Sequence, residues 1–445
     1  MDLSIAQALR VNSSSSIAFI GAGGKTTAMF QLARQLSPPV IVTATSHLGV
    51  WQAGLADLHI MTERPGPLEE LEHGLSGVIL VTGEADGERT NPVNNHLLNW
   101  LQQFCSYHSI PLLIEADGSR EKPLKAWAEH EPPIPSFVEQ VVQVVGVTGL
   151  GKVLGNEHVH RPELFSKLAG LSIGAPITPD SLVQVLTHAD GGQKKIPASS
   201  RRVVLLNQAD TPDLQSVAQG LAQSLLRSYH SVIIASLKQE KIFAVHEPVA
   251  GIILAAGEST RFGRAKQLLD WKGRPFVSAV AKTALEAGLS PVLVVTGANA
   301  EQVEPAVRNL NVTLIRNEDW RSGQGGSIKA GVRALIGKTT EVAGAAIFLL
   351  TDQPQITTSI LRALAEKHAE GLYPIIAPMV MDQRANPVLF DRATFPDLMM
   401  LEGDVGGRAI FHKHRVEYLP WHDDRLLLDV DTPDMYRRLI SDETL

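Results

Sequence analysis

Residues 251–266 read GIILAAGESTRFGRAK and decide the fold of the second half of the chain. The apolar residues 251–254 indicate a buried strand, which ends in the small residues 255–257. Small residues let a ligand approach the backbone closely. Two cations, Arg261 and Lys266, follow within the same stretch. A buried strand that opens into a small-residue loop with two cations predicts a phosphate-binding site.

The spacing Leu-Ala-Ala-Gly-x-Ser-x-Arg-x-Gly-x-x-Lys runs from Leu254 to Lys266. It differs from the dinucleotide-binding fingerprint, whose glycines have other offsets and which lacks the paired cations. An ordinary strand-to-helix turn with surface charge is the alternative interpretation. The stretch resembles the signature of nucleotidyltransferases related to the molybdenum cofactor guanylyl- and cytidylyltransferases, over nearly all of residues 249–436. The nucleotide-binding residues that this resemblance implies are Leu254, Ala255, Ala256, Gly257, Ser259, Gly326 and Ser327.

Two acidic segments in the second half predict a metal site. Asp352 follows the apolar run 345–350, and a carboxylate at a strand end suits Mg²⁺, which takes one or two carboxylates plus substrate phosphates. The segment 429–433 matches the family's Asp-x-Asp-Thr-Pro element, and the resemblance implies that Asp431 is the second metal ligand, with Asp429 as the weaker choice. Either segment alone is also typical of a helix cap.

The resemblance implies a catalytic set of Arg261, Lys266 and Asp352, in which the cations hold the triphosphate. A phosphate monoester is already an anion at neutral pH, so its attack on an α-phosphate needs charge neutralisation and alignment rather than a general base. The residues that the resemblance implies on the acceptor side are Asn386, Pro387, Asp404 and Gly407.

One position in the loop bears on the base, whereas the acceptor is what the resemblance implies. The cytidylyl branch of the family has Leu-Ala-Ala-Gly, whereas the guanylyl branch usually has Leu-Ala-Gly-Gly, and Ala256 places a methyl group where a purine would need room. We therefore predict CTP as the donor and the molybdopterin cofactor as the acceptor. Two alternatives are a sugar- or polyol-phosphate nucleotidyltransferase and a catalytically inactive, nucleotide-sensing assembly factor for a molybdenum hydroxylase.

Residues 17–36 predict a second phosphate site in the first half of the chain. The apolar run 17–20 leads into the loop 21–24, Gly-Ala-Gly-Gly, and then into Lys-Thr-Thr and helical apolar spacing. These are the parts of a P-loop. Phe19 stands where the standard pattern has its first glycine, so a tighter, P-loop-like turn is expected. A simple helix-opening turn is the alternative. The predicted phosphate-binding residues are Gly23, Gly24, Lys25, Thr26 and Thr27.

Polar residues follow two further predicted strands of the first half. The stretch 111–118, PLLIEADG, ends in acidic residues, and Asp117 is expected to help hold Mg²⁺ there. Strand 202–206 is followed by Asn-Gln-Ala-Asp, which is close to the guanine-reading Asn-Lys-x-Asp of GTPases except that a glutamine replaces the lysine. Asn207 and Asp210 are therefore the candidates for base recognition.

Several of these segments together resemble the accessory-protein family linked to selenium-dependent molybdenum hydroxylases, over roughly residues 1–240. The resemblance implies a molybdenum hydroxylase apoprotein as a partner. Strands alternate with helices in both halves of the chain, which is typical of α/β folds. We predict two domains, 1–245 and 249–445, with a linker at 238–248. Each is expected to be a mostly parallel open sheet with helices on both faces, P-loop-like in the first and Rossmann-like in the second.

Composition excludes several function classes. The net charge of −7 argues against nucleic-acid binding, which depends on neutralising phosphates. The single cysteine, Cys105, cannot form an intramolecular disulfide, so we expect a cytoplasmic protein. No run reaches the ~18 apolar residues of a membrane helix.

Overall fold

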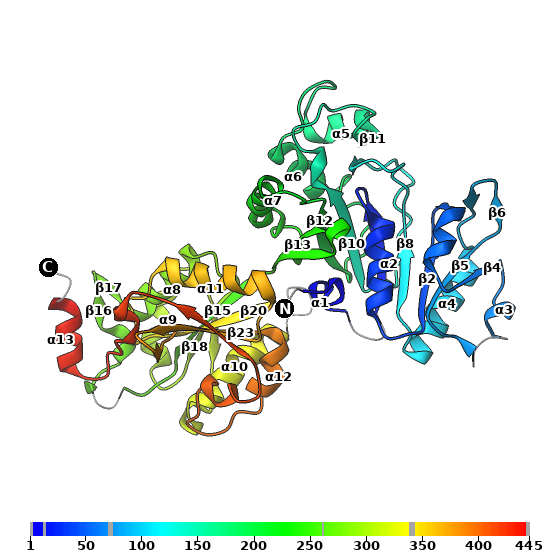
Figure 1. Cartoon of the computed structure of the whole chain (residues 1–445). Helices are drawn as coiled ribbons and strands as arrows, with labels where there is room; N and C mark the ends of the chain where they lie inside the picture. Colours follow the sequence, from blue (N-terminus) through cyan, green and yellow to red (C-terminus); the bar gives the residue numbers. More distant parts are fainter. Residues whose placement is uncertain (1–2, 12–14, 70–73, 260–261, 338–342, 442–445) are drawn as a thin grey trace. The chain divides into compact units, whose positions relative to one another are not determined.

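The computed structural model describes residues 3–11, 15–69, 74–259, 262–337 and 343–441. Within the chain, two compact units follow one another, Met1–His246 and Glu247–Leu445. Both are α/β units in which helices flank an open sheet (Figure 1).

The N-terminal unit is built on one large sheet. Its strands are β1 (Ser16–Gly21), β2 (Val40–Ala44), β4 (Leu58–Met61), β5 (Val78–Thr82), β8 (Leu112–Glu115), β10 (Gln140–Gly146), β12 (Arg201–Asn207), β13 (Ser231–Ser236) and β14 (Lys241–His246). Their order is β14-β13-β12-β10-β1-β8-β2-β5-β4, and only the β13–β14 pair is antiparallel among the described residues. Every residue of β2, β5, β8 and β10 is buried, as expected of parallel strands covered on both faces.

Helices and short strands complete this unit. The helices are α1 (Ile5–Leu9), α2 (Lys25–Gln35), α3 (Gly66–Glu69), α4 (Asn95–His108), α5 (Pro162–Ala169), α6 (Pro179–Thr187) and α7 (Pro212–Leu225), and a 3-10 helix, η1, spans Val50–Leu55. The short strands are β3 (Leu48–Gly49), β6 (Ala85–Asp86), β7 (Arg89–Thr90), β9 (Leu124–Lys125) and β11 (Val159–His160).

The predicted linker, 238–248, is largely not a linker. Most of it forms β14, which pairs with β13 at the edge of the sheet. Ile242, Ala244 and Val245 are buried, so this segment packs into the unit despite its polar composition.

The C-terminal unit has a mixed sheet. Its strands are β15 (Val249–Ala255), β18 (Val292–Thr296), β19 (Thr313–Arg316), β20 (Ala345–Leu350), β21 (Ile375–Val380), β22 (Gln383–Arg384), β23 (Val388–Asp391) and β24 (Val416–Pro420). The order is β19-β18-β15-β20-β23-β21-β22, with β24 paired to β21. The strands from β19 to β20 are parallel, whereas β23 is antiparallel to β20 and to β21.

The helices of this unit are α8 (Phe276–Glu286), α9 (Ala300–Val307), α10 (Gln324–Ile336), α11 (Thr358–Gly371), α12 (Phe395–Leu398) and α13 (Pro433–Ser441), and the strands β16 (Asp270–Trp271) and β17 (Arg274–Pro275) form a small hairpin. The 3-10 helices η6 (Lys266–Leu268) and η7 (Trp320–Ser322) lie in loops after strands.

Register places the candidate residues at one edge of this sheet. Leu254 at the end of β15 lies opposite Leu350 at the end of β20, and Ala255 lies opposite Thr296 of β18. Since parallel strands share their direction, the loops that follow β15 and β20 emerge side by side at the carboxyl edge, where open α/β sheets bind ligands.

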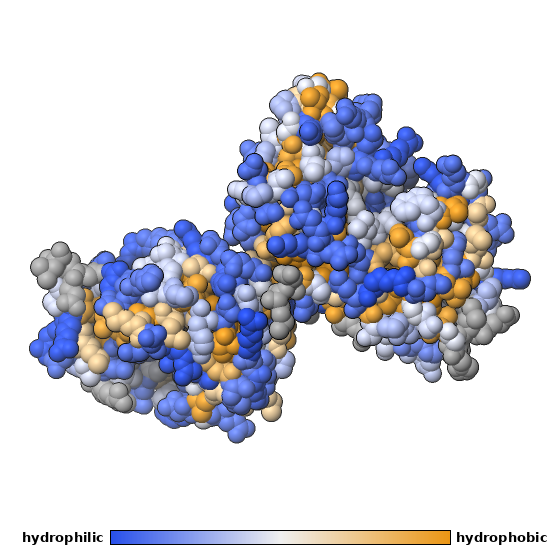
Figure 2. All heavy atoms as spheres, viewed as in Figure 1, coloured by the Kyte–Doolittle hydropathy of each residue, from blue (hydrophilic) through white to orange (hydrophobic). Residues whose placement is uncertain are grey.

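Hydrophilic side chains dominate the visible surface of each unit, with apolar side chains scattered between them (Figure 2). Among the described residues, no helix combines the length and the apolar character needed to cross a membrane.

Helix α10 packs closely on the sheet through Gly331. A Cβ atom at this position would lie 2.6 Å from Ile252 Cγ2, in the buried core. We expect Gly331→Ala to destabilise the C-terminal unit by about 1–3 kcal/mol through overpacking. Gly220, on an exposed face of α7, has open space around its missing Cβ. Gly220→Ala should instead stabilise by roughly 0.5–1 kcal/mol through helix propensity. Calorimetric unfolding of both variants measures the two changes in stability. Equal changes in stability for Gly331→Ala and Gly220→Ala would contradict this prediction.

Candidate functional site

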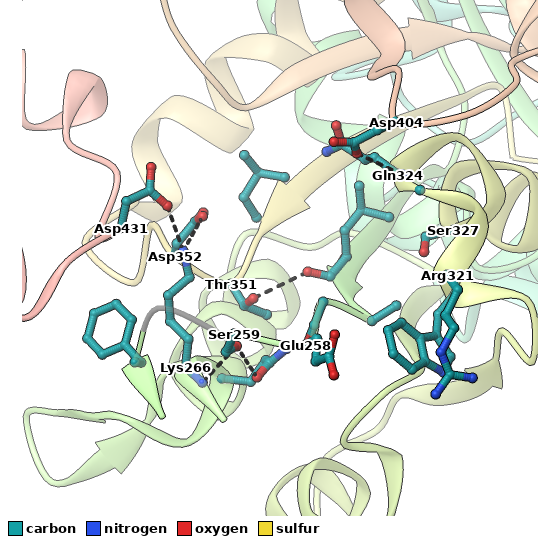
Figure 3. Close-up of a pocket in the computed structure, with 18 residues that line it drawn as sticks. Glu258, Ser259, Lys266, Arg321, Gln324, Ser327, Thr351, Asp352, Asp404 and Asp431 are labelled. Carbon is teal, nitrogen blue, oxygen red and sulfur yellow. Dashed lines mark hydrogen bonds and ion pairs between the residues drawn. The ribbon is translucent and has the colours of Figure 1, made fainter. Parts of the chain in front are cut away.

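A cavity of about 580 Å³ lies at the carboxyl edge of the C-terminal sheet. Its walls come from the loops after β15 and β20, from η7 and the start of α10, and from the segment before α13 (Figure 3). The residues predicted from the sequence that line it are Leu254, Ala256, Gly257, Ser259, Lys266, Ser327, Asp352, Asp404 and Asp431.

The side chain of Gln267 holds the small-residue loop, 255–257, in place through two hydrogen bonds. Its Nε2 donates to the carbonyl oxygens of Ala255 (3.1 Å) and Gly257 (2.7 Å), and its side chain is buried. The Oγ of Ser259, a residue with φ +59°, accepts from the backbone N–H of Lys266 at 3.0 Å. These bonds fold the loop back on itself, so Lys266 points into the cavity together with the loop backbone.

Lys266 lies between two carboxylates (Figure 3). Its Nζ is 2.9 Å from Asp352 Oδ2 and 3.0 Å from Asp431 Oδ1. The backbone N–H of Val430 donates to the carbonyl of Asp352 at 3.0 Å, which brings the C-terminal acidic segment to the end of β20. Burial works against the Lys266 ammonium, but Asp352 and Asp431 outweigh it and hold the pKa of Lys266 above its usual value.

The two carboxylates fit a divalent cation. Asp352 Oδ1 is buried and has no hydrogen-bond partner in the described part of the chain. Asp352 Oδ2 and Asp431 Oδ1 already converge on one positive group. Oxygen ligands of this kind suit Mg²⁺. The weaker candidate, Asp429, accepts from Gln353 Nε2 at 2.7 Å and does not line the cavity; burial, together with Asp352, raises its pKa.

Trp320 and Arg321 form a wall of the cavity that the sequence did not reveal. The Arg321 guanidinium lies 4.4 Å from the centre of the Trp320 ring. A Cβ atom at Gly297 would lie 2.7 Å from Trp320 Cβ and 2.8 Å from Ala256 Cβ, so these three residues pack tightly beside the loop. A lone tryptophan in a polar loop belongs to no motif, so the sequence carried no signal for it.

The remaining predicted residues of this unit lie elsewhere. Arg261 is outside the described residues. Ala255 is buried within β15, and Gly326 is in α10 against Ser322 Oγ. The predicted acceptor residues are divided: Asp404 lines the cavity and accepts from the backbone N–H of Gln324 at 3.3 Å. The three that do not line it are Asn386, Pro387 and Gly407.

In the N-terminal unit, the glycine loop after β1 is held from several sides. Gly21, Gly23 and Gly24 all have positive φ, and a Cβ atom at Gly23 would lie 2.3 Å from the backbone N of Gly146. Asn207 Nδ2 donates to the carbonyl of Gly23 at 2.7 Å, and its Oδ1 accepts from the backbone N–H of Leu237 at 2.9 Å. The side chain predicted to read a base therefore holds the loop.

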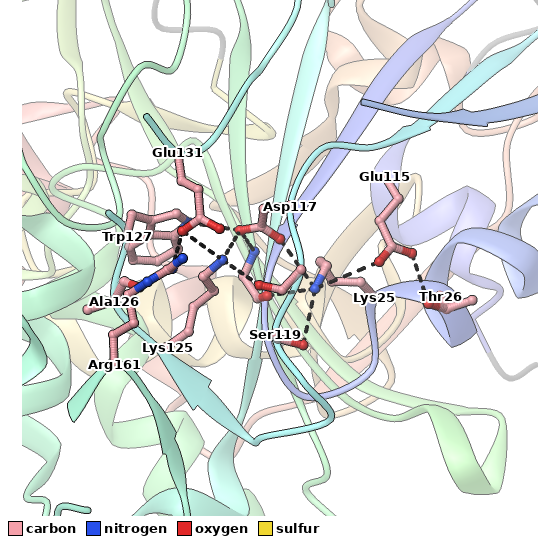
Figure 4. Close-up of polar contacts among 12 residues, drawn as sticks. Lys25, Thr26, Glu115, Asp117, Ser119, Lys125, Ala126, Trp127, Glu131 and Arg161 are labelled. Atoms are coloured by element: carbon pink, nitrogen blue, oxygen red, sulfur yellow. Dashed lines mark hydrogen bonds and ion pairs between the residues drawn. The ribbon is translucent and has the colours of Figure 1, made fainter. Parts of the chain in front are cut away.

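Asp117 is engaged inside the protein (Figure 4). Its Oδ2 accepts from the backbone N–H of Gly21 (3.0 Å), Lys125 Nζ (3.0 Å) and Trp127 Nε1 (2.8 Å), and its Oδ1 lies 3.2 Å from Lys25 Nζ. Burial alone would raise its pKa, but the two lysines outweigh burial and lower it. Asp117 does not line the neighbouring cavity, whereas Glu115 does.

Asp210 is likewise bound within the unit, since its Oδ1 accepts from Ser236 Oγ at 2.5 Å. The five predicted residues of the loop and helix start, by contrast, line one cavity, which also contains Gln208. They are Gly23, Gly24, Lys25, Thr26 and Thr27.

Comparison with known proteins matches each unit separately. Residues 251–418 match the model of the MobA-like NTP transferase domain, and residues 17–163 match that of the YqeC protein. Uncharacterized protein YqeC of Escherichia coli K12 is 32% identical over 43% of this chain and 75% of its own length. Nicotine blue oxidoreductase of Paenarthrobacter nicotinovorans is 31% identical over 43% of this chain and 96% of its own length. Molybdenum cofactor cytidylyltransferase of Escherichia coli K12 is 28% identical over 41% of this chain and 91% of its own length.

Two of these relatives have names from different reaction classes, so a name alone does not assign the reaction of this chain. The family assignments themselves agree with the resemblances found in the sequence. With a YqeC domain in its N-terminal unit, the chain belongs through its C-terminal unit to the MobA-like NTP transferase family.

Proposed function

We propose that the C-terminal unit transfers CMP from CTP to the phosphate of the molybdopterin cofactor and releases pyrophosphate. The observation that carries the proposal is the convergence of Lys266, Asp352 and Asp431 beside the small-residue loop after β15. A cation and two carboxylates suit a reaction between anions, in which charge must be neutralised and held in line.

The proposed reaction needs no protein nucleophile. An oxygen of the acceptor phosphate forms a bond to the α-phosphorus of CTP, and the bond from that phosphorus to the bridging oxygen breaks. The electron pair leaves with pyrophosphate. Lys266, with Arg261, would hold the triphosphate, while Asp352 and Asp431 would hold Mg²⁺. When bound, Mg²⁺ supplies neutralisation of the phosphate charge.

The choice of CTP rests on the packing around Ala256. Its methyl group and Trp320 both pack next to Gly297, and both residues line the cavity beside the loop. A pyrimidine needs less room there than a purine. The molybdopterin acceptor is supported by the family signature and by the relative named molybdenum cofactor cytidylyltransferase.

The N-terminal unit is proposed to serve a molybdenum hydroxylase apoprotein that receives the modified cofactor. Support comes from the sequence resemblance of this unit to hydroxylase accessory proteins. Joining both units in one chain would keep the cofactor near its recipient.

The test is turnover of the purified chain with each nucleoside triphosphate and molybdopterin, followed by pyrophosphate release and by mass spectrometry of the product. We expect a higher kcat/KM for CTP than for GTP, and a partial shift towards GTP in Ala256→Gly. Equal values for CTP and GTP would contradict the cytidylyl assignment, and transfer to sugar or polyol phosphates instead would contradict the acceptor. NADH- or NADPH-dependent reduction without pyrophosphate release would favour a redox enzyme.

Asp352→Ala should lower the transfer rate more than about tenfold, because it removes a carboxylate from the reacting phosphates. Asp434→Ala provides the matched control, since Asp434 is an exposed aspartate of α13 in the same unit. If Asp352→Ala keeps more than about a tenth of the rate, a loss of less than ~1.4 kcal/mol in transition-state stabilisation, the metal assignment is wrong.

Lys266 and a divalent cation should compete for the same carboxylates. Removing the ammonium by Lys266→Gln should tighten Mn²⁺ binding without nucleotide at least about fivefold, since a unit charge at this distance contributes on the order of 1 kcal/mol even in water. Paramagnetic resonance of free Mn²⁺ measures the change. Lys282→Gln, on the exposed face of α8, is the control.

The double variant Lys266→Gln/Asp352→Ala should lose the gain in Mn²⁺ affinity, because the liberated carboxylate is gone. Unchanged Mn²⁺ affinity in the single variant would mean that Lys266 does not occupy the metal position.

A further inference from the structure

We propose that the N-terminal unit binds a nucleoside triphosphate of its own, with the phosphates at the start of α2 and the base against Trp51. This proposal stands whether or not the C-terminal unit transfers nucleotides. The site is a cavity of about 1210 Å³ at the carboxyl edge of the N-terminal sheet. Its walls come from the segments that follow β1, β2, β8 and β12.

At the start of α2, backbone N–H groups have no hydrogen-bond partner among the residues that the structure describes. The first intrahelical bond runs from the N–H of Ala28 to the carbonyl of Gly24, at 3.0 Å. The N–H groups of the preceding turn therefore have no partner within the helix. The N-cap residue, Gly24, has no side chain to cap them. Donors of this kind, aided by the helix dipole, bind phosphate groups. Thr27 is exposed at this turn and lines the cavity.

A buried amide at the same place lacks a partner. Gln52 of η1 is 9% exposed and lines the cavity. Its Nε2 donates to Thr26 Oγ1 at 3.3 Å, whereas its Oε1 has no hydrogen-bond partner in the part of the chain that the structure describes. Leaving a buried polar atom unpaired is costly, so an amide oxygen that faces a cavity is suited to accept a hydrogen bond from a ligand there.

An acidic side chain stands behind the same threonine (Figure 4). Thr26 Oγ1 donates to Glu115 Oε2 at 2.8 Å, and Glu115 is the last residue of β8, the strand next to β1. Lys25 Nζ, which donates to the carbonyl of Gly21 at 2.8 Å, also lies at this end of the cavity. The Thr26 hydroxyl and the N–H groups at the start of α2 form the phosphate end of the cavity, and Glu115 holds that hydroxyl in place.

Trp51 provides an aromatic surface on another wall of the cavity, away from the polar phosphate end. Its side chain lines the cavity and is 64% exposed, which is unusual for a large aromatic residue. The indole lies against Gly49, where a Cβ atom would be 2.6 Å from Nε1, so the glycine makes room for this pose. An exposed aromatic face stacks on any nucleobase. The cavity therefore offers a phosphate end and a ring end.

The charges of the wall favour a small nucleotide over a nucleic-acid strand. The cations Lys25, Arg89 and Arg120 are matched in number by the lining acids Glu88, Glu115 and Glu121. Attraction for phosphate thus comes from the backbone N–H groups at the start of α2, not from a basic surface that could follow a polyphosphate backbone.

The decisive variant is Thr27→Glu in the full chain. A carboxylate at the third position of α2 would occupy the anion site and repel phosphate, while it suits the helix start and should leave the fold intact. The control, Gln219→Glu, adds the same carboxylate on the exposed face of α7, outside the wall of this cavity. Equilibrium dialysis with radiolabelled ATP, GTP and CTP, without acceptor, counts the bound nucleotides. Calorimetric unfolding checks that both variants fold.

We expect Thr27→Glu to lose one equivalent of bound nucleotide and the control Gln219→Glu to keep it. Two results would overturn the site. One is that Thr27→Glu binds as much nucleotide as wild type. The other is that wild type binds only one equivalent, the one whose affinity Lys266→Gln lowers. Pyrophosphate release reports on the C-terminal unit separately, so failure of one proposal is distinguishable from failure of the other.

Trp51→Ala tests the ring end, with tripolyphosphate as the baseless probe. Nucleotide affinity should fall about tenfold, because a stacking surface is lost, and tripolyphosphate affinity should change less than about twofold. Equal losses for both ligands, or no loss for the nucleotide, would overturn the placement of the base on Trp51.

Discussion

Each unit depends on the same interaction: a lysine that follows the loop after a central strand and pairs with a carboxylate from the end of the neighbouring parallel strand. In the N-terminal unit, Lys25 after β1 meets Asp117 beyond β8. In the C-terminal unit, Lys266 after β15 meets Asp352 beyond β20. Parallel pairing brings both loops to one edge of a sheet, so the charge pair is a direct consequence of topology.

The two lysine–aspartate pairs differ in how deeply they are buried, and this difference gives them different roles. The side chains of Lys25 and Asp117 are 3% and 0% exposed, and Asp117 is also bound by Lys125. Removing one partner would leave a buried charge, so this pair holds its loop in place. Lys266 and Asp352 are 16% and 22% exposed, and they line an open cavity. Because both side chains are partly exposed, we propose that they give up this pairing when a metal ion and phosphates bind.

Contiguous motifs account for what the sequence predicted. The signature ending at Lys266, the carboxylates Asp352 and Asp431 and the glycine loop are local patterns next to apolar strands, and the structure groups them by strand order. Gln267, Trp320 and Gln52 could not be found in this way, because each belongs to no motif and its role depends on contacts that exist only in the folded chain. The prediction of a linker at 238–248 was wrong for a related reason. The edge strand β14 has a polar exposed face, and only its pairing with β13 identifies it as a strand.

A crystal structure of the chain with Mn²⁺ and a non-hydrolysable CTP analogue, in which anomalous scattering locates the metal, tests the proposed metal and phosphate site most directly. We expect Mn²⁺ bound by Asp352 and Asp431, with Lys266 Nζ moved from both carboxylates to the phosphates. Lys266 still paired to both carboxylates, with nucleotide bound and Mn²⁺ elsewhere, would contradict this proposal.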